Sequence, residues 1–154
     1  MPLSRFHEAQ LLGCTFLEIT LQSLDFSHAT LSKVSVIECL LLALVFNQSH
    51  LRGVGWITCQ APEIDFQHAQ LNDCVFAAGT QLPRARFNGA RMTQCNLRGC
   101  LLQQSQFRLA HLVNSDLSEA DCSQADMRQL QANDCQFIRT RFQQARLTDS
   151  NLTG

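Results

Sequence analysis

Apolar side chains recur at every fifth residue along nearly the whole chain. One series runs from Phe6 to Phe76 without a charged or polar member, and after a shift of one residue a second runs from Leu82 to Leu152. An α-helix returns to the same face every 3.6 residues and a β-strand every two, so neither element keeps a period of five on one side. The pattern therefore predicts a backbone that turns a corner every five residues.

A second series of mostly small side chains stands two residues before each large one. It contains seven of the eight cysteines, and the eighth, Cys122, takes a large-residue position. This placement favours compact, buried thiols as core filler. Cys39 and Cys59 are the only pair that we expect to stack closely enough to test for a disulfide. The chain has no CxxC pair, so a zinc site is not indicated and no metal or other cofactor is expected.

The repeat is most literal where a small residue, Asp or Asn, and a large apolar residue follow one another: Ser115-Asp116-Leu117, Ala120-Asp121-Cys122, Ala125-Asp126-Met127 and Ser150-Asn151-Leu152. These segments resemble the A(D/N)Lxx pattern of the pentapeptide repeat family, and the resemblance covers residues 4 to 152. It implies an all-β fold, a right-handed four-sided parallel β-helix with one pentapeptide on each side. The chain would then form about seven and a half coils of twenty residues.

The residues offer an independent test of a twenty-residue coil, because like should stack on like. Every fourth large residue forms a ladder of aromatic and then aliphatic groups on one side: Phe6, Phe26, Phe46, Phe66, Phe87, Phe107, Met127 and Leu147. The next side carries a ladder that is mainly leucine. Each coil would lie about 4.8 Å above the last, the spacing of paired strands.

We expect a single solenoid domain over residues 1–154, with a one-residue register slip or kink at about 77–82 that divides it into 4–76 and 82–152. Gly79 and Pro83 lie in or beside this stretch and favour a local bulge. The insertion is either simply absorbed or shapes a bend or loop for binding, as a similar break does in topoisomerase-protecting relatives.

Neither end of the repeat offers a helix that would cap the stack. Exposed end coils favour packing against another copy, against another domain or end to end. Family modules also occur in larger proteins, including secretion-associated ones, so this chain is a candidate module of such an assembly. The helical dimerisation segment of topoisomerase-protecting relatives has no counterpart after Leu152.

Composition and charge narrow the function classes. The 154 residues are 45% hydrophobic and suit one domain; the net charge of −1 divides into −4 for residues 1–80 and +3 for residues 81–154. No signal sequence is visible, and the longest apolar run, Cys39 to Phe46, is far shorter than the ~20 residues of a membrane span. We expect a soluble, cytoplasmic, bacterial protein without membrane association.

Function should depend on the outward residues, because the inward ones are set by the fold. An apolar outward stripe at twenty-residue spacing comprises Leu17, Ile37 and Ile57, with Leu40 and Leu42 nearby, and is the candidate partner-binding surface. The simpler alternative is that scattered exposed aliphatic residues are normal on a β surface.

A basic set in the C-terminal half is a weaker candidate for contact with an anionic partner; it comprises Arg84, Arg86, Arg91, Arg108 and Arg128. A mixed, solvated surface is the alternative, and direct nucleic-acid binding is disfavoured. Asp25 and Asp65 share a column but Val45 separates them, so no continuous acidic ladder of the kind found in DNA-mimicking family members is present.

No GxSxG, Walker loop, HExxH or paired-carboxylate signature is present. The sequence predicts a non-enzymatic scaffold that mediates protein–protein interaction. The alternative is a DNA-mimicking, topoisomerase (gyrase)-binding protein that confers quinolone tolerance.

Overall fold

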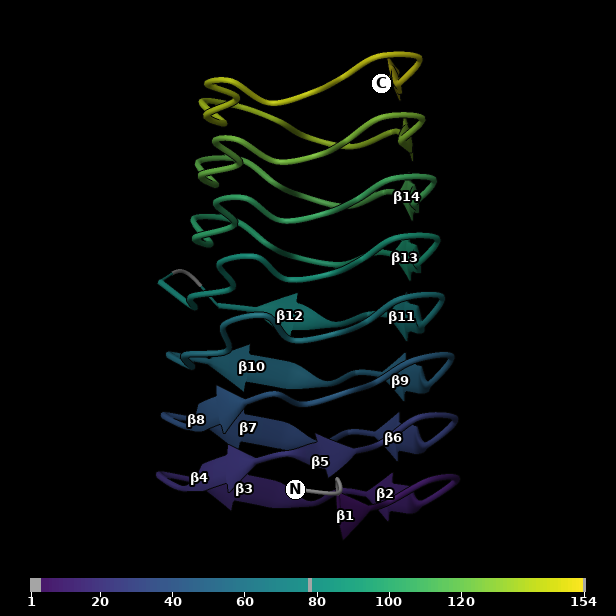
Figure 1. Cartoon of the computed structure of the whole chain (residues 1–154), viewed down its shortest axis with the longest axis vertical. Coiled ribbons are helices and arrows are strands. Elements are labelled where there is room, and N and C mark those ends of the chain that lie inside the picture. Colours follow the sequence, from purple (N-terminus) through teal and green to yellow (C-terminus); the bar gives the residue numbers. More distant parts are fainter. Residues whose placement is uncertain (1–3, 78, 154) are drawn as a thin grey trace.

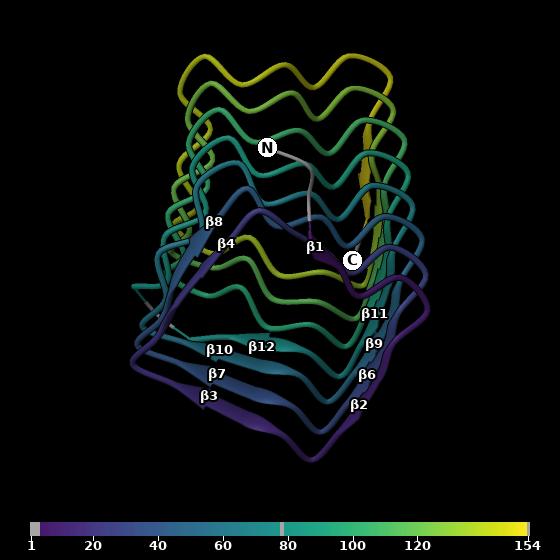
Figure 2. The same ribbon diagram turned by 60° about the horizontal axis from the view of Figure 1, so that its bottom comes forward.

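The structure is a computed structural model that describes residues 4–77 and 79–153. The described chain is all-β and winds into a right-handed, four-sided parallel β-helix, the fold that the sequence predicts. Figure 1 shows the coils stacked along the long axis, and Figure 2 shows their square outline.

Four parallel sheets form the sides of the helix. The longest has eight strands: β2 (Gln10–Leu12), β6 (Thr30–Ser32), β9 (His50–Arg52), β11 (Gln70–Asn72), β13 (Arg91–Thr93), β14 (His111–Val113), β15 (Gln131–Asn133) and β16 (Asn151–Thr153). The next has four: β3 (Thr15–Leu17), β7 (Ser35–Ile37), β10 (Gly55–Ile57) and β12 (Val75–Phe76). Two pairs complete the set: β4 (Thr20–Gln22) with β8 (Leu40–Leu42), and β1 (Ser4–Arg5) with β5 (Leu24–Asp25).

Each corner depends on one residue in the left-handed region of backbone space. It stands two positions after the large inward residue, and where it is not glycine its φ lies between 51° and 62°. Such a conformation is uncommon for residues with a Cβ, yet it turns the chain sharply enough to end each side after a few residues. This repeated turn is the physical origin of the period of five.

The Asp or Asn of the repeat closes the turn. The Oδ1 atom of Asp116 accepts a hydrogen bond of 2.8 Å from the backbone N–H of Ser118, and that of Asn96 accepts one of 2.9 Å from Arg98. A short side-chain acceptor is needed to reach an N–H group two residues further on. The local hydrogen bond therefore explains why this position of the repeat favours Asp and Asn.

The aromatic ladder forms the centre of the core. From Phe6 to Phe107 the six rings stack with centroid separations of 4.7 to 5.2 Å. Trp56 and Phe76 stack on the adjacent side, 5.7 Å apart, and meet Phe66 nearly at right angles. Side chains that stack in register on every coil make the interior continuous along the axis.

Residues that pair on neighbouring coils are twenty positions apart along most of the β-helix, and twenty-one apart across the coil that holds the inserted residue. Leu71, for example, lies between Leu51 and Met92 in the long sheet. The extra residue is accommodated at the corner after Phe76, where Gly79 has φ of 86° and residue 78 lies outside the described residues. Thr80 then takes the small inward position, fully buried, and its hydroxyl donates to the carbonyl oxygen of Trp56.

All eight cysteines are free thiols. The Sγ atoms of Cys39 and Cys59 each lie 3.2 Å from a backbone carbonyl oxygen, which suits buried thiols. The expectation that these two form the only stacked pair is wrong. Cys74 and Cys95 also stack on adjacent coils, two residues after the paired Asn72 and Thr93, and the inserted residue sets them twenty-one apart.

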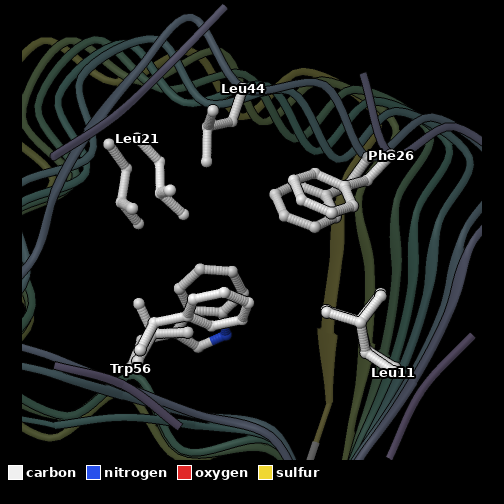
Figure 3. Close-up of a pocket in the computed structure, with 10 residues that line it drawn as sticks. Leu11, Leu21, Phe26, Leu44 and Trp56 are labelled. Carbon is white, nitrogen blue, oxygen red and sulfur yellow. The ribbon is translucent and has the colours of Figure 1, made fainter. Parts of the chain in front are cut away.

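The interior is apolar along the described coils. Figure 3 looks into its N-terminal part, where Leu11, Leu21, Phe26, Leu44 and Trp56 point inward from the surrounding sides. The indole N–H of Trp56 is buried without a hydrogen-bond partner, and the rings of Phe46 and Phe66 lie nearly perpendicular to it. Aromatic faces can accept a weak hydrogen bond of this kind.

Candidate functional site

Leu17, Ile37 and Ile57 lie side by side on the outer surface of the four-stranded sheet. Each is the last residue of its strand, in β3, β7 and β10, and Ile37 is the parallel partner of both the others. Leu17 is 52% exposed and Ile57 is 40% exposed, whereas Ile37 between them is half-buried. We call these three residues, with Leu40 and Leu42, the apolar face.

Leu40 and Leu42 reach this surface from the next side of the solenoid. Both belong to β8, where Leu40 is the parallel partner of Thr20 and both leucines are half-buried. Only the inward-facing Cys39 and the exposed corner residue Glu38 separate Ile37 from Leu40 along the chain, so the two apolar sides meet at a corner that carries a carboxylate. Leu42 stands at the far end of the same strand, beside the following corner.

Val75 is a further exposed aliphatic residue of the same sheet, at the opposite strand end from Ile57, and was missed by the sequence reasoning. It begins β12, is 41% exposed, and has Gly55 as its parallel partner on the coil below. Glycine has no side chain to cover it, so the valine remains open to solvent. The signal was present in the sequence, since an apolar residue stands one coil above a glycine.

Three of the five candidate arginines are already engaged with carboxylates. Arg84 contacts Glu63 at 2.8 Å, Arg86 lies 3.6 Å from Asp65, and Arg128 binds Asp126 through two nitrogen atoms. Hydrogen bonds and charge from Arg128 lower the pKa of Asp126 below its ordinary value. Much of the positive charge in this set is therefore neutralised within the solenoid.

Arg91 and Arg108 have no ion-pair partner among the residues that the structure describes. Arg91 lies in β13 of the long sheet, away from the column of Arg86. Arg108 borders a shallow hollow in the surface. The hollow is also lined by Arg128, Gln129, Arg146, Thr148 and the acidic residue Asp149. The five arginines thus occupy several columns and do not form one basic patch.

The acidic residues also alternate with other types along the axis. The bridged column on the side of the aromatic ladder contains acids, bases and neutral residues in turn: Asp25, Val45, Asp65, Arg86, Gln106, Asp126 and Arg146. Successive coils therefore present charges of opposite sign or none at all. This column does not reproduce the uniform negative charge of a nucleic-acid backbone.

Within residues 4–77 and 79–153 no group of three or more His, Cys, Asp or Glu is placed to hold a metal ion. In the same ranges no helix has the length and hydrophobicity needed to cross a membrane.

The chain belongs to the pentapeptide repeat family. The family model described as pentapeptide repeats matches eight copies, over residues 63–104, 95–129 and 115–154. Proteins of this family are structural repeat scaffolds, and no catalytic family is matched. No curated protein matches the chain in sequence.

Solved structures of similar shape include trypsin-treated forms of QnrB1, a plasmid-mediated fluoroquinolone resistance protein. One shares 18% identity at a TM-score of 0.54 and covers 96% of this chain and 92% of its own. A second shares 14% identity at a TM-score of 0.50 and covers 92% and 74% respectively. At these identities the likeness establishes the fold alone.

Proposed function

We propose that this pentapeptide repeat solenoid is a non-enzymatic scaffold that binds a protein partner through the apolar face. The observation that supports the proposal most is the alignment of Leu17, Ile37 and Ile57 on three consecutive coils, held in register by parallel pairing. Contiguous apolar surface of this kind often marks a partner site on a soluble protein.

The rigidity of the solenoid favours such a role. The strands that carry Leu17, Ile37 and Ile57 are joined by parallel pairing, so these side chains keep their spacing before a partner arrives. A preorganised surface loses little conformational freedom on binding, which leaves more of the contact energy as affinity. Exposed aliphatic residues elsewhere, such as Leu109, stand singly and lack this arrangement.

The test compares two matched aspartate substitutions. Ile37→Asp places a charge in the centre of the apolar face, whereas Val113→Asp changes a half-buried aliphatic residue at the same position of a strand on another side. Proteins captured from a bacterial lysate by each variant would be compared quantitatively with those captured by the wild-type chain.

We expect Ile37→Asp to lose a partner that Val113→Asp retains, with similar unfolding temperatures for the two variants. Equal capture by both variants would remove the apolar face from consideration. Arg91 and Arg108 are the remaining candidates for an anionic partner, and their substitution by glutamate is the corresponding test.

The alternative is binding to DNA gyrase with tolerance of quinolones. Its support is limited to the shared fold with QnrB1, and the mixed charges of the bridged column speak against DNA mimicry. A supercoiling assay with added protein separates the two functions, because dose-dependent inhibition or protection from a quinolone would favour gyrase binding. Packing of the end coils against another copy or within a larger assembly is compatible with either function.

A further inference from the structure

The charged residues on the two sides of the solenoid that carry the apolar face are all negative in the first three coils. In the first three coils these sides are built from residues 14–23, 34–43 and 54–63, all of which the structure describes. The three segments contain no Lys, Arg or His, and their only charged residues are Glu18, Glu38 and Glu63. Every other side chain on them is apolar or neutral.

Two of these three glutamates are free to meet a partner. Glu63 is paired with Arg84 of the next coil, whereas Glu18 and Glu38 have no ion-pair partner among the described residues. Both are exposed and stand at corners, directly after Leu17 and Ile37. Backbone hydrogen bonds join their corners to the next coils, with Glu18 donating to Ile37 and Glu38 to Ile57. The apolar face therefore has a fixed acidic border.

Most of the backbone of this surface is not available to a partner strand. The N–H and C=O groups of β7 and β10 pair with neighbouring coils on both edges, whereas β3 is the edge strand of its sheet, so a partner that lies across all three strands must bind through side chains. An α-helix laid along the solenoid axis presents a side chain on one face once per turn, about every 5.4 Å, which is close to the coil spacing of about 4.8 Å. Over three coils, its apolar residues can follow Leu17, Ile37 and Ile57 in turn.

We propose that the apolar face, together with Glu18 and Glu38, binds an amphipathic α-helix that carries Lys or Arg beside its apolar stripe. The inference rests on the proposed function, to which it adds the shape and charge of the partner. The apolar stripe of the helix covers the aliphatic side chains, while its basic residues contact the two corner carboxylates. Opposite charge at the border selects the partner and its orientation.

The experiment uses two synthetic helical peptides, longer than about 15 residues so that they are helical in isolation. Both carry leucine at every third or fourth position; one has lysine and the other glutamate along the flank. Their binding to the full chain is measured by fluorescence anisotropy at low and high salt. The protein variants are Glu18→Lys with Glu38→Lys, and a control in which Glu8→Lys is combined with Asp149→Lys. The control has the same net charge and changes two exposed corner residues on another side.

We expect the lysine peptide to bind the wild-type chain roughly tenfold more tightly than the glutamate peptide, with a preference that weakens as salt rises. The Glu18 and Glu38 double variant should reverse the preference, and the control variant should keep it. Equal binding of the two peptides, absence of binding by both, or an unchanged preference in the double variant would overturn the inference.

The outcomes distinguish this inference from the proposed function. If Ile37→Asp loses a captured protein while the peptides show no charge preference, the apolar face binds a partner of another kind and only the inference fails. If Ile37→Asp and Val113→Asp capture the same proteins, the proposed function fails. Loss of lysine-peptide binding in Ile37→Asp, with retention in Val113→Asp, would support both.

Discussion

Substitution of Phe66 by alanine should destabilise the solenoid far more than the same change at Phe6. Phe66 is fully buried and stacks on Phe46 and Phe87 at 5.2 Å on either side. It also meets Trp56 and Phe76 nearly at right angles, with ring centroids 5.7 and 6.1 Å away. Phe6 is 44% exposed and stacks on one ring, that of Phe26.

The magnitudes follow from burial and from the number of neighbouring rings. Truncation of a buried phenylalanine costs about 3–5 kcal/mol, and the upper part of that range applies to Phe66 because the coils above and below hold the cavity open. Phe6 is only partly buried, and solvent can fill the space that its side chain would leave. We therefore expect Phe6→Ala to lower the free energy of unfolding by about 1–1.5 kcal/mol. The ratio of the two costs is therefore about three.

Urea unfolding measures both values. The fluorescence of Trp56, the single tryptophan, reports on the same part of the core. A repeat stack gains its stability from contacts between neighbouring coils, so an interior coil must lose more than an end coil. Equal costs for the two substitutions, or a cost for Phe66→Ala below about 1.5 kcal/mol, would refute this account of the core.

Three further predictions concern acid stability, corner strain and thiol reactivity. The pKa of Asp126 in the folded state is lowered below its ordinary value of 3.8, so the ionised carboxylate stabilises the fold above about pH 3.8 and this stabilisation is lost as the pH falls through the folded-state pKa. Asp126→Asn should therefore flatten the acid limb of a plot of unfolding free energy against pH. Thr58 holds φ of 53°, which is unfavourable for a β-branched residue, so Thr58→Gly should stabilise the fold by up to about 1 kcal/mol in urea unfolding, whereas Thr15→Gly in the extended β3 should destabilise it. Burial raises the pKa of two interior thiols, Cys100 and Cys122, to about 12, so a disulfide reagent at pH 8 should react first with the half-buried thiols near the ends, Cys14 and Cys135.

The sequence was sufficient to predict the coil and its ladders because the repeat is physically demanding. Every fifth residue must be large and apolar, and residues of one ladder must stack within about 5 Å, so the sequence alone predicts that Phe26 stacks on Phe46. The positive φ at each corner leaves little trace in the sequence, since most corner residues are glutamine, glutamate or other polar types rather than glycine. The period of five carries that information instead.

The features that the sequence did not reveal lie near the inserted residue or depend on side-chain conformation. Thr80 and the pair Cys74 and Cys95 were missed because the insertion shifts their spacing. The contact between Arg84 and Glu63 depends on how two long exposed side chains orient, which the repeat does not determine.

The apolar face follows from the repeat once the outward positions are aligned by coil. Leu17, Ile37 and Ile57 could be grouped from their spacing, and the parallel register places them together. The charges around them are equally periodic, but their value to a partner depends on which are already paired. Only the structure distinguishes Glu63, which is bound to Arg84, from Glu18 and Glu38, which have no ion-pair partner among residues 4–77 and 79–153.

Helix binding at the apolar face is tested most directly by a methyl NMR titration of the full chain with the lysine-flanked helical peptide. We expect chemical-shift changes to concentrate at the methyl groups of the apolar face and Val75, while those of Val113 and Leu109 on other sides remain unchanged. Shifts spread evenly over all sides, or concentrated away from Ile37, would contradict it.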